Sequence, residues 1–160
     1  MTRISDVITK VEEWLMIILI AALLIIITLS VAFRYFLNEP LSWAGEVSIF
    51  ILVWITFLGG SWGLKHNSQA SVSFLIDKFS GRMKKMLVII QLLCMVTFLA
   101  FILFFSYKWI FLPSVLAQKS SSLLLPMWIP YSAVPIGLTF ATIHLLVRIS
   151  QFSVKKEEAR

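Results

Sequence analysis

Long stretches of this sequence lack charge altogether. Charged residues make up only 14% of the 160 residues, whereas 59% are hydrophobic. A soluble domain usually carries about 25% charged residues. The composition therefore disfavours a water-soluble domain and indicates lipid as the solvent.

Residue types that carry chemistry are scarce as well. The single cysteine, Cys94, lies inside an apolar run, so the chain can form no internal disulfide. Serine and histidine show no arrangement for nucleophilic catalysis, and we expect neither an enzyme nor a cofactor. The net charge of +6 does not indicate nucleic-acid binding, because the basic residues collect in the gaps between apolar runs.

The uncharged stretches are long enough to cross a bilayer, which takes about 20 apolar residues in a helix. The first run is too long for the core of a signal peptide, so we expect it to remain as the first span. Before the last span, Pro126 and Pro130 argue for a loop that ends where a helix can begin. The sequence thus predicts an all-α integral membrane protein, one domain over residues 1–160, with four spans at approximately 14–33, 47–64, 86–107 and 130–147.

Orientation follows from the basic residues. Eleven lysines and arginines lie in the two tails and the gap at 65–85, whereas three, Arg34, Lys108 and Lys119, lie in the other gaps. Basic residues favour the cytoplasmic side. We therefore predict that both termini and the 65–85 segment are cytoplasmic.

The 65–85 gap also predicts an amphipathic helix, at approximately residues 69–80. Its apolar positions recur at helical spacing, and lysine and arginine accompany them, which suits a helix lying on the membrane surface. An N-terminal extension of the third span is the alternative, but Gly81 favours a break. The candidate lipid-facing residues are Val72, Leu75, Ile76 and Phe79, with Lys78 and Arg82 near the headgroups.

The predicted spans contain no mid-membrane Asp, Glu, Lys or Arg, so this chain is a poor candidate for a substrate or ion pathway. Gly59 and Gly63 lie four apart and can border a groove where another helix packs closely. His66 and His144 fall near span ends. They could be axial haem ligands, but a hydrogen bond to a neighbouring helix is the preferred interpretation for His144.

The first external gap holds the other candidate contact residues: Arg34, Glu39, Trp43 and Glu46. The two carboxylates could bind a cation or an external partner. The alternative, which we favour, is an interfacial ion pair that fixes the loop.

The sequence resembles a known family in several segments. Arg34–Trp43, then Glu46, and then residues 54–60 resemble the hallmark region of the small membrane subunit (DctQ type) of tripartite ATP-independent periplasmic (TRAP) transporters. Residues 130–137 resemble the opening of that family's last helix. One departure is visible at residues 69–73, where the family often has a histidine and an aspartate.

This resemblance implies a three-part importer of the bacterial inner membrane. A periplasmic binding protein captures an organic acid, such as a C4-dicarboxylate or sialic acid, and a large membrane subunit moves it with sodium by an elevator-like motion. The small subunit pairs with the large one and anchors it as a scaffold in the lipid. The alternative function is a membrane-anchor or haem-bearing subunit of a respiratory enzyme; a self-assembling channel would need polar residues that the spans lack.

Overall fold

The computed structural model describes residues 2–66, 78 and 81–158. Its described part is built of helices, and four of them are long and apolar enough to cross a membrane. The prediction of an all-α membrane protein with four spans is therefore confirmed. The helices are α1 (Thr2–Ala32), η1 (Phe33–Leu37), α2 (Ala44–Lys65), α4 (Gly81–Ile110), α5 (Pro113–Ala117), α6 (Trp128–Tyr131) and α7 (Ala133–Glu158).

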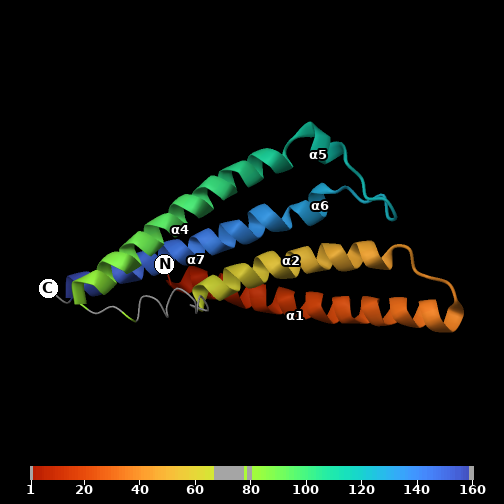
Figure 1. Cartoon of the computed structure of the whole chain (residues 1–160), viewed down its shortest axis with the longest axis horizontal. Coiled ribbons are helices and arrows are strands. Elements are labelled where there is room, and N and C mark those ends of the chain that lie inside the picture. Colours follow the sequence, from red (N-terminus) through yellow and green to blue (C-terminus); the bar gives the residue numbers. More distant parts are fainter. Residues whose placement is uncertain (1, 67–77, 79–80, 159–160) are drawn as a thin grey trace.

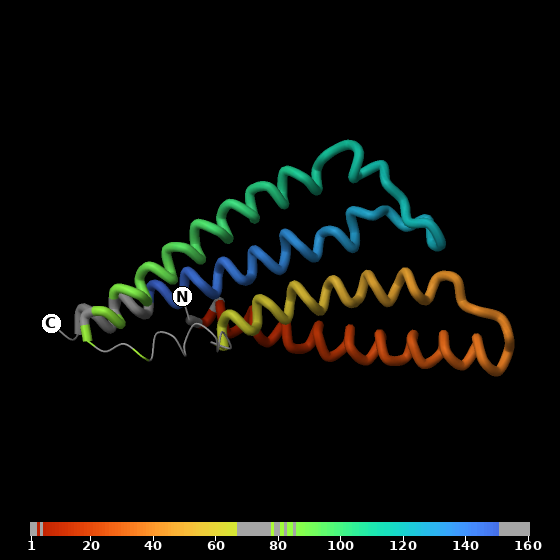
Figure 2. The backbone as a smooth tube through the Cα atoms, viewed as in Figure 1, coloured from red at the N-terminus to blue at the C-terminus, as the bar shows by residue number. Residues whose placement is uncertain are grey.

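The long helices form an open row rather than a closed bundle (Figure 1). α1 and α2 pack side by side as an antiparallel hairpin, α7 packs on α2, and α4 packs mainly on α7. The smooth trace in Figure 2 shows α4 diverging from α2 toward the end that carries α5. Both termini lie at the other end. We call the end with the termini the terminal end, and the end with residues 33–46 and 110–132 the hairpin end.

The first helix is longer than the apolar run that predicted it. It begins at Thr2 rather than near Trp14, so the charged residues before the run continue the helix beyond the apolar part. At the other end the helix passes into the π-turn η1, and Asn38 stops it with φ 51°, donating its N–H to the Phe33 carbonyl. Asparagine is one of the few non-glycine residues that readily adopts this left-handed conformation.

A very close backbone contact joins α2 to α7. A Cβ built on Gly137 would lie 2.7 Å from the Cβ of Phe57 and 2.9 Å from its carbonyl oxygen. Only a residue without a side chain allows the two backbones to come this close. Gly137 therefore allows this close approach of α7 to α2.

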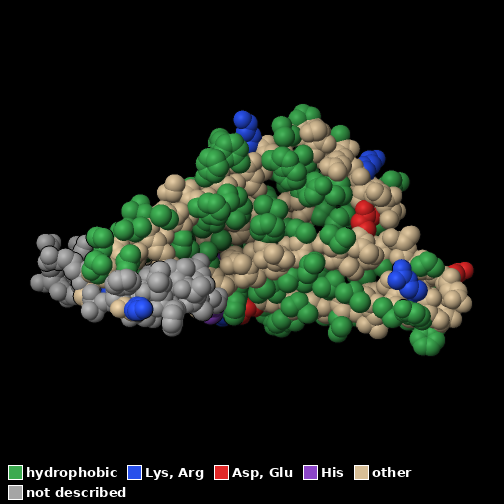
Figure 3. Space-filling model, viewed as in Figure 1, with side chains coloured by type: hydrophobic (Ala, Val, Ile, Leu, Met, Phe, Trp, Pro, Cys, Tyr) green, Lys and Arg blue, Asp and Glu red, His purple; other side chains and the backbone are tan. Residues whose placement is uncertain are grey.

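A small apolar core lies between α4 and α7. Leu92 and Leu99 of α4 meet Leu145 of α7, and Leu145 is only 1% exposed. Few other leucines in the described spans are buried to this degree. Most apolar side chains instead face outward, and Figure 3 shows them spread over the middle of one face. Such a surface suits lipid or another membrane protein.

The fourth span is reached through a structured loop, as the prolines predicted. Lys119 and Pro126 form an isolated antiparallel bridge, and α6 begins at Trp128. A break at Ser132 separates α6 from α7. The helix therefore starts slightly before the predicted position and continues past residue 147.

The predicted surface helix at approximately 69–80 lies outside the described residues, apart from Lys78, which is exposed. α4 begins directly after this segment at Gly81, whose φ is +64°. This left-handed backbone fits the predicted break at Gly81.

We predict that Gly137→Ala lowers the midpoint of thermal unfolding in detergent micelles. The new methyl group would have to push Phe57 away, and overpacking of this kind costs about 1–3 kcal/mol. Gly60→Ala is the matched control, because nothing lies within 4 Å of the added methyl group there. Gly60→Ala should leave the midpoint unchanged or raise it slightly. Equal losses in the two variants would contradict the close approach at Gly137.

Candidate functional site: polar clasps at the two ends of the helices

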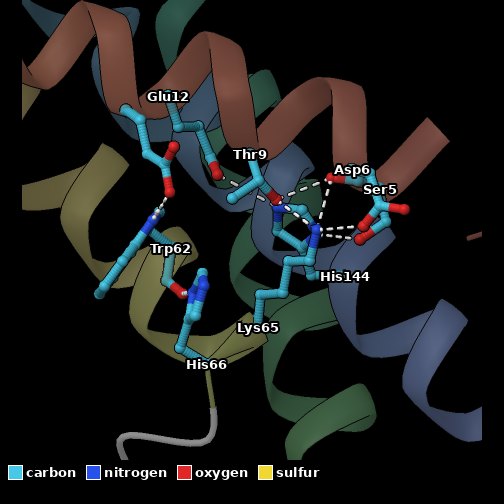
Figure 4. Close-up of polar contacts among 9 residues, drawn as sticks. Ser5, Asp6, Thr9, Glu12, Trp62, Lys65, His66 and His144 are labelled. Atoms are coloured by element: carbon cyan, nitrogen blue, oxygen red, sulfur yellow. Dashed lines mark hydrogen bonds and ion pairs between the residues drawn. The ribbon is translucent and has the colours of Figure 1, made fainter. Parts of the chain in front are cut away.

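A buried polar chain joins α1 to α7 at the terminal end. The Ser5 hydroxyl lies 2.7 Å from Nδ1 of His144, and Nε2 of the same ring lies 3.1 Å from a carboxylate oxygen of Glu12. Glu12 is 0% exposed, and the other two are 3% exposed. Figure 4 shows these side chains turned toward one another between the helices.

The spacing along α1 explains why these groups face inward. Ser5, Thr9 and Glu12 are separated by four and then three residues, so they lie on one face of the helix. All three are buried, and the Thr9 hydroxyl donates to the Ser5 carbonyl at 2.7 Å. The first turns of α1 therefore present a polar stripe to α2 and α7.

The end of α2 adds a second set of contacts to this stripe. The Lys65 ammonium donates to three oxygens of α1: the Ser5 carbonyl at 3.1 Å, the Asp6 carboxylate at 2.7 Å and the Thr9 hydroxyl at 2.7 Å. The ion pair with Asp6 is partly exposed and contributes little by itself. Three acceptors on one helix nevertheless fix the position of this side chain and of the last turn of α2.

One turn earlier in α2, Trp62 makes the neighbouring contact. Its indole N–H donates to the Glu13 carboxylate at 2.9 Å, and its ring stacks on His66 with centroids 4.0 Å apart. Tryptophan with an engaged N–H is typical of the boundary between lipid and water. We call these residues together the terminal clasp: Ser5, Asp6, Thr9, Glu12, Glu13, Trp62, Lys65 and His144.

The terminal clasp holds helices together rather than offering a reactive group. Both ring nitrogens of His144 already have partners, which leaves neither free for haem iron. The interpretation of His144 as a span-end residue bonded to a neighbouring helix is thus confirmed. Within the described ranges, no group of three or more His, Cys, Asp or Glu residues is placed to hold a metal ion.

A second polar contact lies at the hairpin end and involves Glu46, in the first turn of α2. One of its oxygens accepts the backbone N–H of Ser121 at 2.9 Å, and the other accepts those of Ser122 at 3.1 Å and Leu123 at 3.2 Å. The Ser122 hydroxyl also donates to the Ser42 carbonyl at 3.3 Å. We call Glu46 and these three amides the loop clasp. Glu46 thus fixes the loop before α6 through its backbone amides, whereas the expected interaction was an ion pair that fixes the loop before α2.

The remaining predicted contact residues are spread over α2 and the turn before it. Arg34 lies in η1 and is exposed, as is Glu39, whereas Trp43 is half-buried directly before α2. A Cβ on Gly59 would lie 3.7 Å from the sulfur of Met16, so Gly59 faces α1 of the same chain. Gly63 lies one turn further along α2.

The candidate lipid-facing residues belong mostly to the segment that is not described. Val72, Leu75, Ile76 and Phe79 lie outside the described residues, so their helix stays a prediction. Arg82 is the second residue of α4.

Two features escaped the sequence analysis. Glu12 and Glu13 lie directly before the first predicted span, and Glu12 is buried against a histidine 132 positions away. Gly137 stands alone in its span, without the four-residue spacing that drew attention to the α2 glycines. The sequence signal that could have indicated the contact of Glu12 with His144 is a carboxylate next to one span together with a histidine inside another.

We predict a measurable coupling between Glu12 and His144 in a double-mutant cycle of alanine variants. Removing either partner leaves the other buried without its hydrogen bond. The losses of unfolding free energy in the two single variants should therefore add up to more than the loss in the double variant. The coupling should be about 1–3 kcal/mol in SDS-induced unfolding from mixed micelles. Lys10→Ala, on the exposed side of α1, provides the control cycle with His144→Ala and should show none. A Glu12–His144 coupling as small as that control would contradict the clasp.

Comparison with known proteins assigns the chain to a family. The family model for the DctQ component of tripartite ATP-independent periplasmic transporters matches residues 23–153. The C4-dicarboxylate TRAP transporter small permease protein DctQ of Vibrio cholerae is 25% identical over 91% of this chain and 72% of its own length. The sialic acid TRAP transporter small permease protein SiaQ of the same organism is 25% identical over 91% of this chain and 83% of its own length.

A third relative is much longer. The isethionate TRAP transporter permease protein DctMQ of Oleidesulfovibrio alaskensis is 30% identical over 78% of this chain, which covers 21% of that protein. The match to the family model extends over most of the chain and includes three of the apolar spans seen in the structure and part of the first. The chain therefore belongs to the DctQ family of TRAP transporter components, and it is a multi-pass protein of the inner membrane rather than an enzyme.

Proposed function

We propose that this chain is the scaffold subunit of a sodium-coupled, binding-protein-dependent importer of an organic acid. It pairs with a large transport subunit and anchors that subunit in the bilayer. The observation that carries the proposal is the buried polar chain at the terminal end, in which His144 of α7 bonds to both Ser5 and Glu12 of α1. Polar groups that bond across helices in this way hold the helices rigidly together, which suits a scaffold.

The pairing with a large subunit is supported by the isethionate relative. The part of that permease protein to which this chain is similar is 21% of its length, so there it is continuous with a much longer chain. The apolar surface of this chain also suits a membrane partner. In the most apolar stretch of α1, 0% of the residues are buried within the chain. In the corresponding stretch of the last span, 39% are buried. α1 is accordingly the span most available to a partner.

The substrate class is proposed from the names of the relatives. They are named for C4-dicarboxylates, sialic acid and isethionate, all of which are small organic anions. Sodium coupling and the role of a periplasmic binding protein follow from the family resemblance. The exposed residues Arg34 and Glu39 at the hairpin end are our candidates for contact with the binding protein.

The proposed orientation places the terminal end in the cytoplasm, because eleven of the fourteen basic residues lie in the segments at that end. We predict that single cysteines at Ser68 and Ser121, introduced into a Cys94→Ala background, react from opposite sides of the membrane. A membrane-impermeant thiol reagent added to intact cells with a permeabilised outer membrane should label Ser121→Cys only. Labelling of both positions from outside would contradict the orientation.

The scaffold function is tested by transport in proteoliposomes. Uptake of an organic acid driven by a sodium gradient should require this chain together with the large subunit. We predict that Glu12→Ala, which weakens the terminal clasp, lowers the rate by reducing the amount of assembled complex and leaves the ranking of competing organic acids unchanged. Lys10→Ala is the matched control and should change neither the rate nor the ranking.

A single substitution in this chain that alters the ranking while assembly is intact would show that the chain lines the substrate pathway. Uptake by the large subunit alone at the full rate would show that transport does not need this chain, and would also contradict the scaffold function.

A further inference from the structure

The loop between α5 and α6, residues 118–127, has a defined backbone although it belongs to no long helix. The Met127 N–H donates to the Gln118 carbonyl at 2.9 Å, and the Ser120 N–H donates to the Leu125 carbonyl at 2.8 Å. These bonds close the loop like a short hairpin. We call its outer part, residues 121–125, the loop tip.

The loop tip is apolar and exposed. Leu123, Leu124 and Leu125 are 37%, 67% and 39% exposed, so three consecutive leucines present their side chains outward. Leu124 also has φ 54°, a backbone conformation that is unfavourable for a residue with a side chain. A loop tip surrounded by water gains nothing from three leucines, and the left-handed position would favour glycine or asparagine.

Most of the backbone amides of this loop have partners within the chain. The loop clasp takes up the N–H groups of residues 121–123, and the Ser120 hydroxyl accepts that of Leu125 at 3.1 Å. Pro126 has no N–H to satisfy. In water such groups need no protein partner, whereas in lipid each unsatisfied one is costly. One carboxylate that accepts three consecutive amides is therefore what a loop entering the bilayer requires.

The surroundings of the loop are those of a membrane boundary. Glu46 holds the loop tip level with the first turn of the membrane-spanning helix α2. Trp109 and Trp128 are both partly exposed nearby in the chain, and the ring of Trp109 contacts Tyr131. Lys119 is exposed at the base of the loop. Aromatic rings and a basic residue are typical of the headgroup layer, and the apolar loop tip beside them suits the acyl chains.

We propose that the loop tip inserts Leu123, Leu124 and Leu125 into the lipid leaflet at the hairpin end, with Glu46 as the internal partner of its amides. The loop then fixes the depth of α6 and α7 in the membrane. The ligand is the bilayer itself, at the boundary between headgroups and acyl chains. This inference needs only a membrane-embedded chain and does not depend on the proposed transport function.

The test is the collision of a nitroxide at the loop tip with oxygen, which concentrates in acyl chains, and with a water-soluble nickel chelate. The full chain carrying Leu124→Cys in a Cys94→Ala background is spin-labelled in vesicles of phosphatidylethanolamine and phosphatidylglycerol. A label on native Cys94, which is exposed in the middle of the third span, gives the lipid reference. A label on Glu39→Cys, exposed at the same end of the molecule, gives the reference for water.

The ratio of oxygen to nickel collisions at Leu124→Cys should exceed that at Glu39→Cys several-fold and approach that at Cys94. Leu123→Cys, with its own Cys94→Ala background, should give the same result if the whole tip is inserted. A ratio equal to that of Glu39→Cys would overturn the proposal. So would a label that neither reagent reaches, because protein rather than lipid would then cover the tip.

A second variant tests the part assigned to Glu46. Glu46→Gln replaces one acceptor oxygen by a donor, so at least one loop amide loses its partner. The nickel collision rate at Leu124→Cys should then rise several-fold as the tip moves toward water. Glu39→Gln is the matched control and should leave it unchanged. An unchanged rate in Glu46→Gln would show that satisfied amides do not hold the tip in lipid, and the proposal would be wrong.

Discussion

Helices in lipid are not driven together by the hydrophobic effect, because the acyl chains are as apolar as their side chains. Close backbone contact and interhelical hydrogen bonds have to supply the association. In this protein the close approach of α7 to α2 at Gly137 has that role, since the Cβ of Phe57 occupies the space that a side chain would need. α2 in turn carries α1, and α7 carries α4. The order of the whole row depends on this central contact.

The polar residues complete what the central contact begins. The terminal clasp ties the start of α1 to α2 and α7, and the loop clasp ties the start of α2 to the loop before α6. Glu12 and Glu46 thus bond within the chain at opposite ends of the helices. The terminal clasp thus holds three of the four spans at one end, and the loop clasp holds α2 to the loop before α6 at the other. This arrangement suits a rigid frame for a partner rather than a pathway for a solute.

The sequence predicted the four spans well, because about 20 uncharged apolar residues have few other uses than crossing a bilayer. It also predicted a break at Gly81 and a loop before Pro130. It could not predict which side chains meet. Glu12 and His144 come together only because α1 and α7 share a neighbour, and no local pattern encodes that pairing. The sequence does not distinguish Gly137 from any other glycine of a membrane helix, because its role depends on the position of Phe57.

The central claim is that this chain stays rigid while its partner moves. Nitroxides at Ile49 on α2 and Lys108 on α4, both exposed and near the hairpin end, report on the least firmly packed part of the row. Their distance distribution should be measured by pulsed EPR in the complex with the large subunit, before and after adding sodium and an organic acid that is transported. The account predicts an unchanged distribution in both states. A shift of its maximum by more than its width would show that this chain takes part in the motion, and would contradict the scaffold function.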